Sequence, residues 1–194
     1  MAADETLLER VVGSGGAFLR LYRWDPPTLS VGRNQRIEES RLPVVRRPTG
    51  GKAVWHEHEV TYAVAAPIAF FGSLRNAYCE IHTRLAEALR SLGVHATLAP
   101  YRPIVRPSDG PISCFASPVG GEIVVRGRKL VGSAQVRRAD ALLQHGSILL
   151  GGRQPAAGLE TTLGAELGRP VSFEEVTQAV IEHWSSDIAS VASG

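Results

Sequence analysis

The alternation of apolar and polar side chains in the first part of the chain predicts β-strands. FLRLYRW (residues 18–24) alternates apolar and basic residues with a period of two, as a half-buried strand does, and the DPP turn ends it. TLSVG and VVRR repeat this pattern. KAVWHEHEVTYAVAA (residues 52–66) predicts a strand, an acidic turn and a second strand. A short helix at residues 6–12 is expected to precede these strands.

Helical periodicity is found in two later stretches. Residues 75–92 form an expected amphipathic helix, closed by Gly93, because apolar side chains recur three and four positions apart at Tyr78, Ile81, Leu85, Leu89 and Leu92. Ser172 and Glu175 have capping-box spacing and open a second helix, FEEVTQAVIEHW, whose apolar face carries Val176, Val180 and Trp184. The tail SSDIASVASG is expected to fray.

The order of these elements indicates the fold class. GEIVV, RGRK, LVGSAQVRR and LLQHGSILL predict an antiparallel strand meander, because their connections are too short to cross over the sheet. Residues 100–118 carry several prolines without periodicity and predict a long loop, a feature that is often functional. We therefore expect one α+β domain over residues 1–194, with mixed, largely antiparallel sheets flanked by helices.

Composition and charge narrow the possible functions. The 21 basic residues exceed the 19 acidic residues by two and are scattered, except at residues 46–47 and 126–129. No basic stripe indicates a nucleic-acid partner. The chain shows no signal peptide and no apolar run near the roughly 20 residues of a membrane span, so we expect a cytoplasmic protein with no membrane partner. Its two cysteines, Cys79 and Cys114, are expected to be free thiols.

Residues 45–64 concentrate candidate binding chemistry. The turn at Gly50 and Gly51 follows two arginines and could present backbone N–H groups to a phosphate or carbonyl, although a plain β-turn with a solvated basic flank explains it equally well. His56 and His58 would share one face of a strand, as half a metal site does. No third ligand lies at a recognisable spacing, so we expect no metal and a hydrogen-bonding role for His56.

The cysteines differ in their surroundings. Cys79 falls beside the apolar stripe of the predicted helix, where a cysteine is usually a small buried hydrophobe. Cys114 falls in the predicted loop, with Arg102 and Arg106 before it and Lys129 after it. A thiol reacts as its thiolate and a nearby ammonium lowers its pKa, so Cys114 is a plausible nucleophile. The sequence carries no Ser-His-Asp, Walker or dinucleotide signature.

Three separated blocks, RRPTGGKAVWHEHEVTY, CFASPVGGEIVVRGRKLVGSAQ and LQHGSILL, resemble the biotin/lipoate ligase-like catalytic domain, and most closely its cysteine-dependent octanoyltransferases. The resemblance runs from about residue 3 to residue 150. It implies transfer of octanoate from octanoyl-acyl carrier protein to a lysine of a lipoyl domain, either in the E2 subunit of a 2-oxoacid dehydrogenase or in the glycine cleavage H protein. It also implies that no ATP and no cofactor are required, because the incoming thioester is already activated.

The resemblance assigns roles by position. It implies that Cys114 is the nucleophile and that Lys129 lowers the pKa of Cys114 and orients the acyl carbonyl. The carbonyl end of the acyl group would be held by Arg47, Thr49, Gly50 and Gly51. The pocket wall would be built by Val54, His56 and Tyr62. Oxyanion N–H groups would come from Gly132, Ser133 and Ala134, and the facing strand would carry His145 and Gly146.

The chain also departs from the family pattern. Residues 1–5 match the interior of a helix that follows an initial strand in relatives, and Ala116 replaces the aspartate of the family's cysteine block. ATP-dependent lipoate ligases, a competing interpretation, resemble RRxSGGGxVxHDxGN, whereas this chain has Lys52 at the third glycine and HEHEVTY further on. The sequence is also compatible with an amidotransferase that uses the same Cys114, and with a catalytically silent acyl-binding module.

Overall fold

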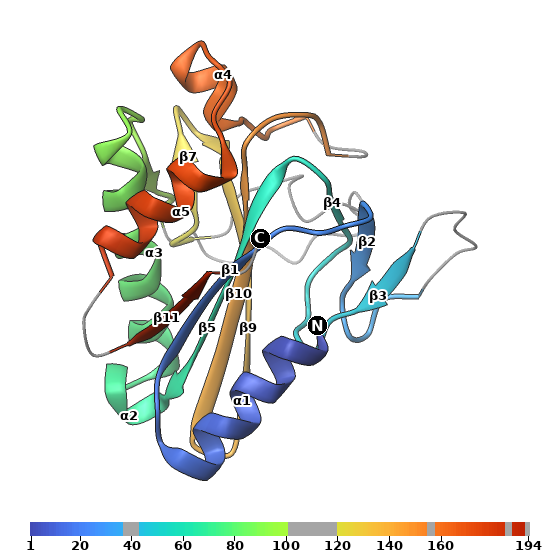
Figure 1. Ribbon diagram of the computed structural model, residues 1–194, viewed down its shortest axis with the longest axis vertical. Helices are drawn as coiled ribbons and strands as arrows, with labels where there is room; N and C mark the ends of the chain where they lie inside the picture. The colour runs from blue at the N-terminus through green and yellow to red at the C-terminus, as the bar shows by residue number, and fades with distance from the viewer. Residues whose placement is uncertain (37–42, 101–119, 155–157, 185–187, 193–194) are drawn as a thin grey trace.

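A five-stranded sheet forms the centre of the computed structural model, which describes residues 1–194 except 37–42, 101–119, 155–157, 185–187 and 193–194. Its strand order is β11-β1-β5-β10-β9 (Figure 1). These strands are β1 (Phe18–Tyr22), β5 (Glu59–Pro67), β9 (Val131–Arg138), β10 (Ala141–Leu149) and β11 (Ala189–Ala192). All neighbours pair antiparallel except β1 and β11, so the sheet is mixed and largely antiparallel, as predicted.

Helices cover both faces of this sheet because side chains alternate along each strand. On one face, Val60, Tyr62 and Val64 of β5 pack with α3 (Leu74–Ser91) and α5 (Phe173–Glu182). On the other face, Ala63 and Ala65 pack with α1 (Ala2–Ser14), whose apolar side chains Leu7, Leu8 and Val11 are buried. The period-two pattern of the sequence therefore divides the protein into two hydrophobic clusters.

Two small sheets lie beside the main one. The first has the order β3-β2-β4 and comprises β2 (Thr28–Val31), β3 (Val44–Arg46) and β4 (Val54–His56). The second has the order β6-β7-β8 and comprises β6 (Thr97–Leu98), β7 (Ile123–Val125) and β8 (Arg128–Lys129). The predicted meander is thus divided between two sheets. The chain passes between them at Leu130, whose N–H donates to Ile123 and whose carbonyl accepts from Leu149.

The helix ends follow capping chemistry. Ser73 accepts a hydrogen bond from the Asn76 N–H at the start of α3, and the chain leaves that helix through Gly93, which has a φ of 95°. Ser172 caps α5 as predicted, but α5 ends two residues earlier than expected. Only half of the predicted capping box forms, because the Glu175 carboxylate pairs with Arg169 at 2.5 Å.

Three features differ from the sequence-based expectations. Residues 189–192 were expected to fray and instead form β11, because the open edge of β1 offers unpaired backbone groups to them. Two short helices, α2 (Ile68–Phe71) and α4 (Leu163–Leu167), were not predicted, since neither is long enough to show a helical period.

Within the described residues, no helix is long and apolar enough to cross a membrane.

Candidate functional site

A pocket lies where the β3-β2-β4 sheet meets β9 and β10. Most of its lining had been singled out from the sequence: Arg47, Val54, His56, Gly132, Ser133, Ala134, His145 and Gly146. The structure adds lining residues that the sequence analysis had not selected: Met1, Ser30, Thr61 and Ser147. Three segments that are far apart in the chain therefore meet in one pocket.

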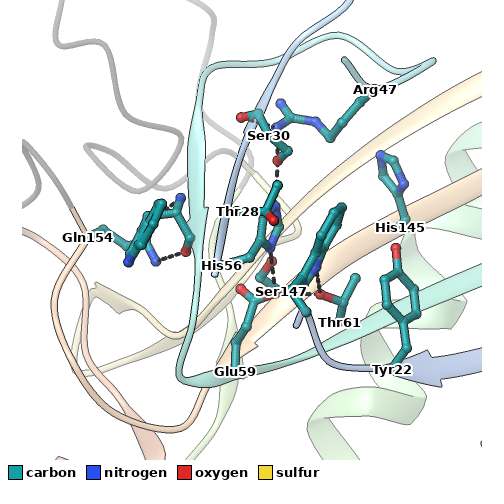
Figure 2. A network of polar contacts seen from close by, with 12 residues as sticks. Tyr22, Thr28, Ser30, Arg47, His56, Glu59, Thr61, His145, Ser147 and Gln154 are labelled. Carbon is teal, nitrogen blue, oxygen red and sulfur yellow. Dashed lines mark hydrogen bonds and ion pairs between the residues drawn. The ribbon is translucent and has the colours of Figure 1, made fainter. Parts of the chain in front are cut away.

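A buried chain of polar contacts runs along one side of this pocket (Figure 2). His56 Nδ1 contacts Glu59 Oε1 at 2.5 Å, and His56 Nε2 contacts the Ser30 hydroxyl at 2.5 Å. Thr61 also donates to Glu59, and the Trp24 ring stacks on the His56 ring with centroids 4.5 Å apart. His56 is therefore held in one orientation by contacts at both ring nitrogens and on its face.

Arg47 extends this network of polar contacts to the backbone of the glycine turn. Its Nη1 donates to the Ser30 hydroxyl at 2.7 Å and to the Ser30 carbonyl at 3.0 Å. Its Nη2 donates to the carbonyls of Gly50 at 3.3 Å and Lys52 at 2.7 Å. The turn also approaches β2 closely, since a Cβ at Gly32 would lie 2.0 Å from the Gly51 carbonyl oxygen. The arginine and the glycines of RRPTGG thus fix the local backbone.

The order serine, histidine, glutamate matches that of a hydrolase triad, although the sequence shows no such signature. Two facts distinguish it from an active nucleophile. The Ser30 side chain is 0% exposed, and its hydroxyl also accepts from Arg47. We therefore interpret this series of polar contacts as a network that positions the side chains of the pocket wall.

The predicted shared face of His56 and His58 is wrong. Glu57 and His58 form the turn between β4 and β5, so the two rings diverge. His56 is 3% exposed, whereas the His58 side chain is 61% exposed. The two histidines do not form half of a metal site.

A second buried chain enters the site from α1. His145 Nε2 contacts the Thr49 hydroxyl at 2.7 Å, and His145 Nδ1 contacts Asp4 at 3.4 Å. Burial lowers the pKa of His145, against the opposing effect of Asp4. Burial alone would raise the pKa of Asp4, but contacts from His145 and Tyr22 lower it below its usual value. A charged Asp4 thus holds a neutral His145 at pH 7.

Asp4 also joins α1 to β1 through two further contacts. Its carboxylate accepts from Arg20 at 2.8 Å and from the Tyr22 hydroxyl at 2.8 Å. A sequence signal for this role existed and was missed. Asp4 lies three or four positions before Leu7 and Leu8, so it is a polar residue on the apolar face of the helix.

The opposite wall of the pocket is formed by β9 and β10. A Cβ at Gly146 would lie 2.4 Å from the Gly132 carbonyl oxygen and 2.6 Å from Ser133 Oγ, so only glycine fits there. The β9 strand is an edge of the main sheet in the described residues, so alternate N–H groups point away from β10. The free edge therefore presents the N–H group of Ser133 alone or those of Gly132 and Ala134, and not all three of the expected oxyanion N–H groups.

Tyr62 lies behind this wall and not on the pocket surface. Its hydroxyl contacts Ser133 Oγ at 2.6 Å and accepts from Gln144 at 3.1 Å, and Tyr62 is 0% exposed. His82 of α3 contacts the same serine at 2.7 Å. Burial, followed by the positive charge of Lys129, lowers the pKa of His82 to about 3. A neutral His82 and Tyr62 thus hold the Ser133 side chain.

Lys129 forms a buried ion pair that the sequence did not reveal. Its Nζ lies 2.8 Å from Glu122 Oε2, and the two side chains are 1% and 2% exposed. The backbone of Lys129 is bonded on both sides, donating to Leu159 and accepting from Thr161. Cys114, its expected partner, lies outside the described residues, as does most of the predicted loop.

The remaining predicted residues lie nearby. Gly50 and Gly51 line a second, more open hollow, which shares Ser133 and Ala134 with the pocket. Thr49 is buried against His145. Of the described candidate residues, all line one of the two hollows except Thr49, Tyr62 and Lys129. Thr49 and Tyr62 contact lining residues from behind, and Lys129 pairs with Glu122.

The fold matches that of solved structures described as lipoate-protein ligases. A crystal structure of lipoate-protein ligase A bound with ATP matches with a TM-score of 0.74 and 20% identity, covering 97% of this chain and 82% of that chain. Ta0514, a putative lipoate protein ligase from T. acidophilum with bound lipoic acid, matches with a TM-score of 0.72 and 20% identity, covering 99% and 84%. At this identity the likeness concerns the fold alone.

The chain belongs to the family described as the lipoyl protein ligase A/B catalytic domain, which matches residues 1–185. Octanoyltransferase LipM of Moorella thermoacetica is 43% identical over 164 residues, covering 77% of this chain and 60% of the relative. Octanoyltransferase LipM of Oceanobacillus iheyensis is 33% identical, covering 95% and 79%. The family resemblance is confirmed. The chain spans 60% of the length of the Moorella relative and of a relative from Carboxydothermus hydrogenoformans.

Proposed function

We propose that the protein is an octanoyltransferase that moves octanoate from octanoyl-acyl carrier protein to a lipoyl-domain lysine, with no ATP. The observation that carries this proposal is the pocket in which Arg47, His56 and residues 132–134 and 145–146 meet. These positions are the ones that the octanoyltransferase resemblance assigns to the acyl site. Relatives named octanoyltransferase, 41–43% identical to this chain, support the same reaction.

The proposed reaction has two balanced steps. The Cys114 thiolate attacks the donor thioester carbonyl, the carrier's thiolate leaves and takes a proton, and an octanoyl-cysteine forms. The acceptor lysine amine then attacks this thioester, Cys114 leaves as the thiolate, and the amine nitrogen loses a proton. Backbone N–H groups on the free edge of β9, within residues 132–134, would bind the oxyanion that develops in each step.

Lys129 supplies a fixed positive charge in this proposal. Its pairing with Glu122 at 2.8 Å offsets the cost of burying the ammonium group. Its charge acts on His82, which in turn contacts Ser133 of the pocket wall. A buried cation whose charge acts on a residue in contact with Ser133 is consistent with the role that the resemblance assigns to Lys129, namely favouring the thiolate of Cys114.

The test is direct acylation of the intact protein. The protein is incubated with octanoyl-acyl carrier protein without ATP, and its mass is measured. We expect one octanoyl group that hydroxylamine removes, absent in Cys114→Ser and retained in the matched control Cys79→Ser. A hydroxylamine-labile adduct that forms at another residue in Cys114→Ser would refute the assigned nucleophile.

Further arms separate the competing functions. Modification of an apo lipoyl domain only with free octanoate or lipoate plus ATP would indicate a ligase, and transfer only from an octanoylated H protein would indicate an amidotransferase. Failure to acylate under every condition would indicate a silent binding module. For Lys129→Ala, we expect the pH midpoint of Cys114 alkylation to rise, and an unchanged midpoint would remove its role.

A further inference from the structure

Five arginines from three separate segments meet in a groove beside the pocket. The described residues that line this arginine groove are Glu5, Leu8, Arg33, Arg46, Arg47, Pro48, Val136, Arg137 and Arg138. Glu5 is the single acid among them, whereas over the whole chain basic residues exceed acidic ones by only two. The positive charge is thus concentrated on this face by the fold.

The backbone around the groove is held in place. Arg46 Nη1 donates to the carbonyls of Gly32, Arg33 and Gln35 at 2.9, 2.9 and 2.8 Å, which fixes the loop that carries Arg33. Arg137 Nε donates to the Ala139 carbonyl at 2.8 Å. These acceptors are neutral, so they orient the guanidinium groups without cancelling their charge.

Two arginines of the groove have acidic partners within the protein, but these ion pairs are long and exposed. Arg137 lies 3.7 Å from Asp140, and Arg138 lies 3.4 Å from Glu9. The two arginine side chains are 60% and 49% exposed, and exposed ion pairs of this length contribute little. An incoming acidic group can therefore replace them.

The groove adjoins the acyl pocket. Arg47 lines both, and Met1 lines the pocket while Glu5, one helical turn later, lines the groove. Along β9, Arg137 lies four residues beyond Ser133 of the pocket wall, a distance of roughly 13 Å at the rise of an extended strand. A lysine side chain reaches roughly 6 Å from its backbone. A partner that docks here must deliver its reacting group on a longer arm.

We propose that the arginine groove docks an acidic surface of the protein that carries the acyl donor on its thioester arm. The inference rests on the proposed function for the identity of the donor, whereas the charge and position of the groove stand by themselves. Complementary charge accelerates encounter and sets the docking register. The acceptor, whose lysine is short, must approach the pocket at another point.

Charge reversal with two donors tests this docking surface. Arg33→Glu and Arg137→Glu are compared with Arg153→Glu, an exposed arginine beyond the opposite end of β10. Cys114 acylation is followed with octanoyl-acyl carrier protein and with the small thioester octanoyl-pantetheine. We expect the KM for the carrier protein to rise about tenfold or more at low salt in the first two variants only. Added salt should raise this KM in the wild type, and the small thioester should react equally with all variants.

Direct binding separates failure of the docking proposal from failure of the proposed function. Anisotropy of a fluorescent acyl carrier protein is measured with each variant, with no turnover required. Weakened binding in Arg33→Glu and Arg137→Glu supports the groove even if no acylation occurs. Binding and KM equal to wild type in both variants would overturn it while leaving the transferase intact. Displacement of the carrier by inorganic phosphate or ATP at the carrier's own concentration would also overturn it, since the groove would then be a small-anion site.

Discussion

Replacing Asp4 with alanine should destabilise the protein far more than its position in the first turn of a helix suggests. The Tyr22 hydroxyl is buried and donates to the Asp4 carboxylate at 2.8 Å. A hydrogen bond of this charge-assisted kind contributes about 1.5–3 kcal/mol. The Arg20 side chain is 20% exposed, so its pair with Asp4 adds at most about 1 kcal/mol. The free energy of unfolding should fall by about 2–4 kcal/mol, which corresponds to roughly 5–15 °C in Tm for a chain of this size.

The pH dependence has a defined sign. The pKa of Asp4 is lowered in the folded protein, so its contribution is present above the unfolded value of about 3.9 and is lost as the pH falls through the folded pKa. The difference in unfolding free energy between wild type and Asp4→Ala should therefore be complete at neutral pH. It should shrink as the solution is acidified below about pH 4.

Urea unfolding followed by tryptophan fluorescence measures this difference across the pH range. Glu9→Ala is the matched control, because Glu9 lies on the same helix with a side chain that is 67% exposed. We expect a change within about 0.5 kcal/mol for that control. Equal losses in the two variants, or a difference that stays constant from neutral to acid pH, would refute the reasoning.

Two further variants test the pocket walls by the same unfolding assay. Gly146→Ala places a Cβ 2.4 Å from the Gly132 carbonyl oxygen and should cost about 3 kcal/mol, whereas Gly13→Ala, with nothing within 4 Å, should be neutral or stabilising. Ser30→Ala removes the hydroxyl shared by His56 and Arg47 and should cost about 1–3 kcal/mol. Ser147→Ala, whose contact with His56 is 3.4 Å long, should cost less, and equal costs would contradict the positioning chain.

Much of the fold could be predicted because its signals are local. The helix α3 carries a clear period of 3.6 over a long run, and the strand β5 carries a long run of β-branched, aromatic and other apolar residues. The turn and capping residues of both elements lie next to them in the chain. The short helix α4 and the tail strand β11 lack such a run. The strand β11 exists because β1 has an open edge, which is a property of the assembled sheet.

The site was predictable by resemblance and not by its contacts. The blocks at residues 46–62, 114–135 and 143–150 identified most of the pocket lining. They did not reveal Asp4, Ser30 or Glu122, because each of these acts on a residue at least seven positions away: His145, Arg47 and Lys129 respectively. Nor did the scattered arginines predict a common groove.

The sequence by itself determined the α+β class, the long strands and helices, the Gly93 end of α3, the Ser172 cap of α5, and the family to which the chain belongs. The tertiary structure alone decided which polar residues share a buried network and where the arginines gather. The physical reason is the separation along the chain over which each kind of interaction acts. Periodicity and capping depend on neighbours within a few residues, whereas a buried hydrogen bond or a concentration of charge depends on segments that only folding brings together.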